Sequence, residues 1–178
     1  MSDLHALCRF APPAWEQIPD LGLYMDQVIT FIGRVYAPVY GADVKRCLTP
    51  AMINNYVKAK LLPRPAGKKY SREQLALLTM IVALKQTSSI EDIRRMLQPR
   101  EDLSTEALYA AFCRRFPQAL SELSADPAEA LSPALDFAIR AAVFQAACAA
   151  ALDREEDTSV IRRAQGTGIA ASARPSPQ

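Results

Sequence analysis

The sequence predicts an all-α protein that is mainly helical, with one short basic loop and two helical parts. Half of the 178 residues are hydrophobic, enough to bury one sizeable core or two smaller ones. In most segments apolar residues recur at spacings of three and four, the period of an amphipathic helix. Capping residues precede several of these segments, and prolines follow some of them.

Residues 1–19 contain three prolines, so an N-terminal arm is expected there, with Trp15 docked on the body. The first helix is predicted over residues 24–35, where apolar residues share one helical face. Residues 36–47, which contain Pro38 and Gly41, are predicted to form a connection.

The segment between Thr49 and Pro99 is expected to hold three helices and one loop. Thr49 is an N-cap followed by Pro50 at the first helical position, which predicts a helix to about Lys60. Residues 61–70 (LLPRPAGKKY) have the composition of a short extended loop or hairpin. A capping box at 71–74 begins a long apolar helix that should be central to the core, and a second capping box at 88–91 begins a short helix.

A separate module is expected over residues 101–163, because the charge changes sign at residue 101. Ser104 caps its first predicted helix, and an alanine-rich helix over 133–163 should pack against it. A membrane span is disfavoured, because alanine contributes little hydrophobicity and Asp136 and Arg140 are charged. Residues 164–178 predict a disordered tail.

Charge is distributed unevenly along the chain. Residues 44–100 contain 12 Lys or Arg against three acidic residues, a net charge of +9, whereas the remainder carries 9 basic and 16 acidic residues, a net charge of −7. A compactly folded cationic segment of this kind favours a polyanionic partner, and nucleic acid before an acidic membrane.

Several classes of active site are disfavoured. The chain has one histidine, His5, which excludes Ser-His-Asp, Cys-His and multi-histidine metal sites built by one chain alone. The four cysteines lie 39, 66 and 35 residues apart, so no pair has a zinc or redox spacing, and free thiols are expected. No apolar signal core follows a cationic start. We therefore expect a cytoplasmic protein that is not an enzyme, with no catalytic residues, metal or cofactor.

The order of the elements through residue 100 is that of a winged helix-turn-helix, whose second helix enters the major groove while a wing contacts phosphates. In the helix after Thr49, Asn54, Asn55 and Lys58 should point outward. Asparagine can read adenine with two hydrogen bonds. The loop adds cations for phosphates: Arg64, Lys68 and Lys69.

The string Met52–Pro63, followed by Lys69–Leu75 and Ser89–Leu97, resembles the MerR signature. Residues 19–97 are also similar to a bacterial family catalogued only as a domain of unknown function, which shares the MerR-like layout. The resemblance implies a DNA-binding domain over residues 20–100. It also implies base or backbone contacts from Asn54, Asn55 and Tyr56, and wing contacts from Arg64, Lys68, Lys69 and Tyr70.

The chain departs from the MerR pattern in ways that bear on mechanism. Asn54-Asn55-Tyr56 replaces Arg-Tyr-Tyr, and Lys60 replaces a glycine. The wing is shorter and the link between the first two helices longer. The promoter-distorting mechanism of MerR proteins is therefore not implied.

These observations favour sequence-specific binding of double-stranded DNA by a transcriptional regulator. Three alternatives stay open at this point. Tyr56 and Tyr70 are equally well explained as core residues. The basic face could dock an acidic protein, and the C-terminal pair could form a ligand sensor or an enzyme, although it offers no paired carboxylates.

The alanine-rich helix predicts a homodimer. It has two neighbouring apolar stripes, and the helix after Ser104 could cover only one of them. A soluble monomer rarely leaves such a stripe exposed. The second stripe, at spacings of four, three and four, suits a close helix pair: Phe137, Ala141, Phe144 and Cys148.

Overall fold

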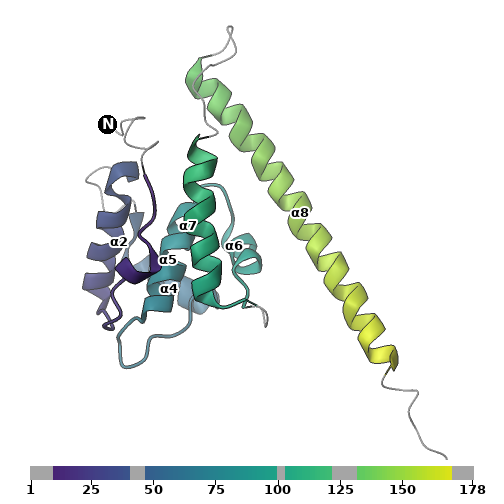
Figure 1. Cartoon of the computed structure of the whole chain (residues 1–178), viewed down its shortest axis with the longest axis horizontal. Coiled ribbons are helices and arrows are strands. Elements are labelled where there is room, and N and C mark those ends of the chain that lie inside the picture. The colour runs from purple at the N-terminus through teal and green to yellow at the C-terminus, as the bar shows by residue number, and fades with distance from the viewer. Residues whose placement is uncertain (1–9, 41–46, 100–102, 122–131, 170–178) are drawn as a thin grey trace, which may run out of the picture. The chain divides into compact units, whose positions relative to one another are not determined.

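The computed structural model describes residues 10–40, 47–99, 103–121 and 132–169. These residues form a short 3₁₀ turn, η1, and six α-helices, which confirms the all-α class (Figure 1). They contain no strand, only two isolated antiparallel bridges. The elements are η1 (Trp15–Gln17), α2 (Met25–Tyr40), α4 (Pro50–Lys58), α5 (Arg72–Leu84), α6 (Ile90–Met96), α7 (Thr105–Ser121) and α8 (Pro133–Ile169).

The chain divides into two compact units, residues 1–129 and 130–178. The predicted boundary at residue 101 is therefore wrong, because α7 belongs to the first unit and packs against α5. The apolar stripe predicted for α7 joins the core of that unit: Leu108, Phe112, Phe116 and Leu120. The change in the sign of the charge at residue 101 therefore does not coincide with a boundary between compact units.

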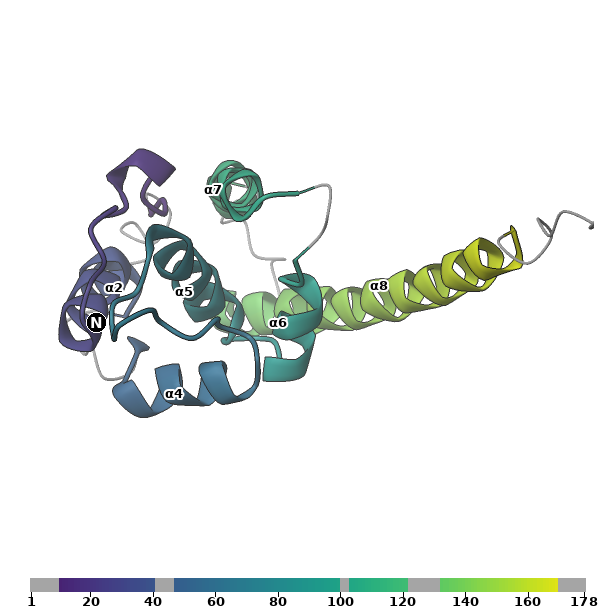
Figure 2. The same ribbon diagram turned by 90° about the horizontal axis from the view of Figure 1, so that it is seen from below.

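Helix α5 is the centre of the first unit, as predicted. Nine consecutive residues, 74–82, are buried, and α2 and α7 pack against the helix (Figure 2). On the α2 side the hydroxyl of Tyr36 donates a hydrogen bond to the carbonyl of Thr79. On the other side the arm is anchored to α7, because the Tyr109 hydroxyl donates to the Pro13 carbonyl at 2.8 Å. The described part of the arm, residues 10–19, is thus built into the core.

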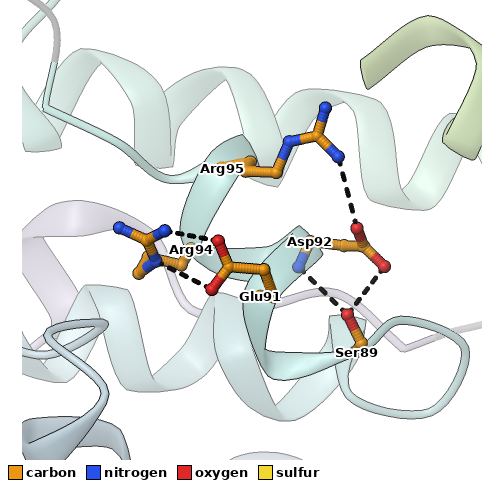
Figure 3. Close-up of polar contacts among 5 residues, drawn as sticks. All are labelled: Ser89, Glu91, Asp92, Arg94 and Arg95. Carbon is orange, nitrogen blue, oxygen red and sulfur yellow. Dashed lines mark hydrogen bonds and ion pairs between the residues drawn. The ribbon is translucent and has the colours of Figure 1, made fainter. Parts of the chain in front are cut away.

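Helix starts follow the predicted caps with one shift. The Oγ1 atom of Thr49 accepts from the amide of Met52, and the capping box at residues 71–74 is complete. The first residue of α6 was predicted one position too early: Ser89 is the N-cap, and its Oγ accepts from the amide of Asp92 (Figure 3). Ser104 caps α7 by accepting from the amide of Ala107.

Two helices are longer than predicted. Helix α2 continues through Pro38 to Tyr40, because burial of Tyr36 holds the last turns while proline removes only one helical hydrogen bond. Helix α8 continues to Ile169, since extending an existing helix costs much less than starting one. Residues 164–169 are thus helical where a disordered tail was expected. Residues 1–9 and 170–178 lie outside the described residues.

Four large apolar side chains of helix α8 are exposed to solvent. Leu135, Ile139, Val143 and Phe144 are between 47% and 69% exposed. Asp136 and Arg140 pair with each other at 2.8 Å along one face. By length and composition alone, residues 134–155 could cross a membrane, which for a single helix is a weak indication.

Candidate nucleic-acid interface

Helix α4 has the two faces that its sequence predicts. Ile53 and Tyr56 are buried, and Thr49 with Pro50 fixes the first turn. The opposite side is a single stripe at positions i, i+3, i+4 and i+7, which are neighbours on a helix surface. All four side chains of this outward stripe are exposed: Ala51, Asn54, Asn55 and Lys58.

The C-terminal end of α4 explains the glycine of the MerR pattern. The amide of Leu61 donates to the Tyr56 carbonyl at 2.9 Å, and the amide of Lys60 donates to the Val57 carbonyl at 3.2 Å. This pair of bonds is a Schellman motif, whose C′ residue adopts the left-handed conformation that glycine favours. Lys60 occupies that position with φ of 57°. The side chain of Lys60 is exposed, and this residue follows the last residue of the outward stripe, Lys58, by two positions.

The loop predicted as a wing, residues 61–70, is built around a single tight turn, and we keep the name wing for it. The amide of Lys69 donates to the Ala66 carbonyl at 3.0 Å, and the two residues between them, Gly67 and Lys68, have φ of 55° and 66°. Positive φ at both central residues is the feature of a type I′ hairpin turn. The expected hairpin is therefore present with only one bridged residue pair, Ala66 and Lys69.

Two contacts hold the wing against the rest of the unit. Leu23 and Tyr70 exchange backbone hydrogen bonds of 3.0 and 2.8 Å, which joins the segment before α2 to the residue after the turn. The buried amide of Gln74 donates to the Pro63 carbonyl at 2.8 Å and accepts from the amide of Ser71 at 2.8 Å. The first residues of α5 thus position the loop on both sides of the turn.

Residues 20–24, between the arm and α2, also position one of the wing cations, a feature that the sequence analysis missed. A Cβ atom on Gly22 would lie 2.9 Å from the Cβ of Lys69, so glycine allows this segment to approach so closely. The Lys69 ammonium lies 5.3 Å from the centroid of the Tyr24 ring, within cation–π distance. The sequence signal for this contact was Gly22 two residues before Tyr24, a pattern too common to have been decisive.

Two of the predicted DNA contacts are wrong. Tyr56 and Tyr70 are only 4% and 3% exposed, and both belong to the core cluster. Burial raises the pKa of both phenols, and the Tyr70 hydroxyl lies against the sulfur of Met25 at 3.9 Å. Their apolar ring area stabilises the core more than solvent exposure would, because aromatic side chains bury large surfaces.

Apart from Lys85, whose ammonium donates to the Cys47 carbonyl, the described cations of the basic segment fall into two groups. Those near α6 and the start of α5 have acidic partners: Arg72 pairs with Asp20, Arg94 with Glu91 and Arg95 with Asp92 (Figure 3). The second group is exposed and has no carboxylate partner within the described ranges. We call these five residues the exposed cations: Lys58, Lys60, Arg64, Lys68 and Lys69.

The exposed cations coincide with a sequence feature that the net charge alone did not isolate. No Asp or Glu occurs between Asp43 and Glu73, a stretch that includes all of α4 and the wing. A count of acidic residues over shorter windows would have separated this stretch from α6. The outward stripe of α4 and the exposed cations together form the candidate interface.

The described residues were searched for metal-ligand clusters and for paired or reactive cysteines. It contains no group of three His, Cys, Asp or Glu side chains that could hold a metal ion. Cys47, Cys113 and Cys148 are free thiols, as predicted, while Cys8 lies outside the described residues. Burial raises the pKa of Cys47 to about 11, which keeps this thiol protonated and unreactive at neutral pH.

Comparison with known proteins gives one match, which lies within the first unit. No curated protein and no solved structure matches the chain. One family model matches residues 13–112, a range that starts at the residue whose carbonyl accepts from Tyr109 and that omits α8 entirely. The match covers more than half of the sequence, from the arm through α4, the wing and α5 into α7. The chain therefore belongs to the family described as Domain of unknown function (DUF1836).

Proposed function

We propose that the protein is a sequence-specific DNA-binding protein and a cytoplasmic transcriptional regulator, with a MerR-like winged helix-turn-helix in its first unit. The observation that carries this proposal is the outward stripe of α4 with its two asparagines, flanked by the exposed cations. Helix α4 would enter the major groove, and the turn at residues 66–69 would follow the phosphate backbone.

The two parts of the interface suit the two tasks of DNA recognition. Asn54 and Asn55 carry amides that can pair with the N6 and N7 atoms of adenine, and α4 presents them without a competing hydrogen-bond partner in the described structure. The exposed cations carry no base information but attract phosphates from any sequence.

A salt titration tests the electrostatic half. Duplexes selected from the source genome by the purified full chain would be titrated at several salt concentrations. Log affinity should fall linearly with log salt, by about 0.9 for each neutralised phosphate. Lys68→Gln should reduce that slope by about 0.9 on specific and random DNA alike. Arg34→Gln removes the same charge from an exposed residue of α2, outside the candidate interface, and should leave the slope unchanged.

Two outcomes would contradict the electrostatic half. The folded chain would fail to bind duplex DNA at low salt, or Arg34→Gln would weaken binding as much as Lys68→Gln does. Either outcome would favour the alternative function, in which the basic face binds an acidic protein. Binding of an acidic protein does not have the salt dependence that counterion release from DNA phosphates produces.

Base reading is tested with Asn54→Ala. On the selected duplex this variant should lose about 1 to 3 kcal/mol of discrimination at one base pair, because an adenine contact is removed while phosphate contacts remain. Lys68→Gln serves as the comparison, since it should weaken all sequences equally. Equal losses for Asn54→Ala on selected and random duplexes would show that this residue does not read a base.

We also propose that α8 makes the protein a homodimer, in which a second copy covers the stripe Phe137, Ala141, Phe144 and Cys148. Phe144 is 69% exposed, and exposed apolar patches of this kind mark interaction sites in soluble proteins. The spacing of four, three and four and the small alanines allow two helices to pack closely. A dimer would also present two copies of α4 to a two-fold operator.

Sedimentation equilibrium at tens of micromolar tests the dimer. The wild-type chain should have twice the monomer mass, and Phe144→Glu should be monomeric with the first unit still folded. Ala146→Glu is the control, because this exposed residue is two positions from both Phe144 and Cys148 and so lies on the opposite side of α8 from the stripe. A monomeric wild-type chain contradicts the proposal, and co-sedimentation of that chain with phosphatidylcholine vesicles would identify a membrane as the surface that covers α8.

A further inference from the structure

The first unit contains a cavity of about 320 Å³ that none of the preceding functions uses. It lies among the segment that leaves α4, the last turn of α6 with the residues after it, and the first turns of α7. Leu77 of α5 contributes to its wall. The volume is at the lower end of the range of about 300–1,000 Å³ typical of small-molecule sites.

The lining of this cavity is apolar with two cations. Eight of the twelve lining residues are apolar, five of them leucines, and the polar uncharged residues are Gln98 and Thr105. Lys60 and Arg94 also line the cavity, and no described lining residue is acidic. The leucines are Leu61, Leu77, Leu97, Leu103 and Leu108.

The two cations differ in how they are occupied. Lys60 is exposed and has no carboxylate partner in the described ranges, whereas Arg94 pairs with Glu91 across one face of α6 (Figure 3). Glu91 is itself exposed, and an exposed pair of this kind is worth little, so a second carboxylate can compete for the guanidinium. A ligand with a negative group and an apolar body would match both parts of the lining.

We propose that this cavity binds a small organic anion, an apolar chain or ring that carries one carboxylate, with Lys60 and Arg94 pairing with the carboxylate. The leucines bury the apolar body, which removes its surface from water. A small inorganic anion would leave that apolar wall uncovered, and a neutral apolar molecule would leave Lys60 without a partner. The ligand would thus contact the segment that joins α4 to the wing.

The proposal is tested by calorimetric titration of the full chain, without DNA, using octanoate and 3-phenylpropanoate as probes. At least one of these should bind saturably. Acetate, which lacks the apolar body, and octan-1-ol, which lacks the charge, should each bind at least about tenfold more weakly.

Charge variants locate the site. Lys60→Asn keeps a residue that tolerates the left-handed conformation and should weaken binding of the carboxylate about tenfold, as should Arg94→Gln. Lys58→Gln removes the same charge outside the lining and should leave binding unchanged. Absence of saturable binding by both probes overturns the proposal, as does equal binding of octanoate and octan-1-ol or an equal loss in all three variants. Since no DNA is present, none of these outcomes bears on the proposed DNA binding.

Discussion

Helices α5 and α8 are both apolar over most of their circumference, but their surroundings are opposite. In α5 nine consecutive residues are buried, with α2 and α7 packed against the helix. In α8 the large apolar side chains at residues 135, 139, 143 and 144 are about half exposed or more. An apolar circumference therefore shows that a helix needs to be covered, and the covering elements must come from elsewhere in the chain or from another molecule.

The largest difference between the two helices should appear when an apolar side chain is shortened. Leu78 of α5 is fully buried, so Leu78→Ala should lower the free energy of unfolding by about 2 to 5 kcal/mol at any protein concentration. Ile139 of α8 is 47% exposed, so Ile139→Ala should cost much less in the monomer. Urea unfolding of both variants at two protein concentrations measures this contrast. Equal, concentration-independent losses would show that α8 is as much a core helix as α5.

Polar groups on the two helices should differ in the same direction. Gln74→Ala removes the two hydrogen bonds that the buried Gln74 amide makes to the Pro63 carbonyl and the Ser71 amide, and at about 0.5 to 1.5 kcal/mol for each bond it should cost about 1 to 3 kcal/mol. Arg140→Gln breaks the partly exposed pair with Asp136 on α8 and should cost at most about 1 kcal/mol. The comparison would fail if Arg140→Gln destabilised the protein more than Gln74→Ala in the same thermal or urea measurement.

The smallest effect concerns the backbone at the C-terminal end of α4. Lys60 has a left-handed φ of 57°, so Lys60→Gly should stabilise the protein by about 1 kcal/mol. The same substitution two residues earlier, Lys58→Gly, should instead destabilise it by about 0.5 to 1 kcal/mol, because Lys58 is helical. Opposite signs in urea unfolding confirm the Schellman end of α4, and a loss in both variants contradicts it.

Local signals predicted local features well. The caps at Thr49, Ser71 and Ser104 lie where expected, because a cap depends on a side chain and an amide two or three residues later. The inward and outward faces of α4 also follow from periodicity alone. The cap of α6 was displaced by one residue, since Ser88 and Ser89 both satisfy the sequence pattern and Asp92 selects the second.

Signals that depend on packing between distant segments were read less well. Charge placed a boundary at residue 101, but Tyr109 and Leu120 of α7 are buried in the core of the first unit. The resemblance to MerR proteins placed Tyr56 and Tyr70 on the DNA side, but both rings face the core. Neither error could be avoided from the chain alone, because both depend on which helix packs against which.

The helical class, the starts of four helices, the outward stripe of α4 and the absence of acidic residues around it could all be predicted from the amino-acid sequence. These features depend on periodicity, capping and charge, which act over a few residues. Three features became known only from the folded chain: α7 packs on α5, Gly22 and Tyr24 support Lys69, and five cations stay exposed while Arg72, Arg94 and Arg95 acquire partners. Pairing and burial depend on contacts between residues far apart in the chain, and no local pattern specifies them.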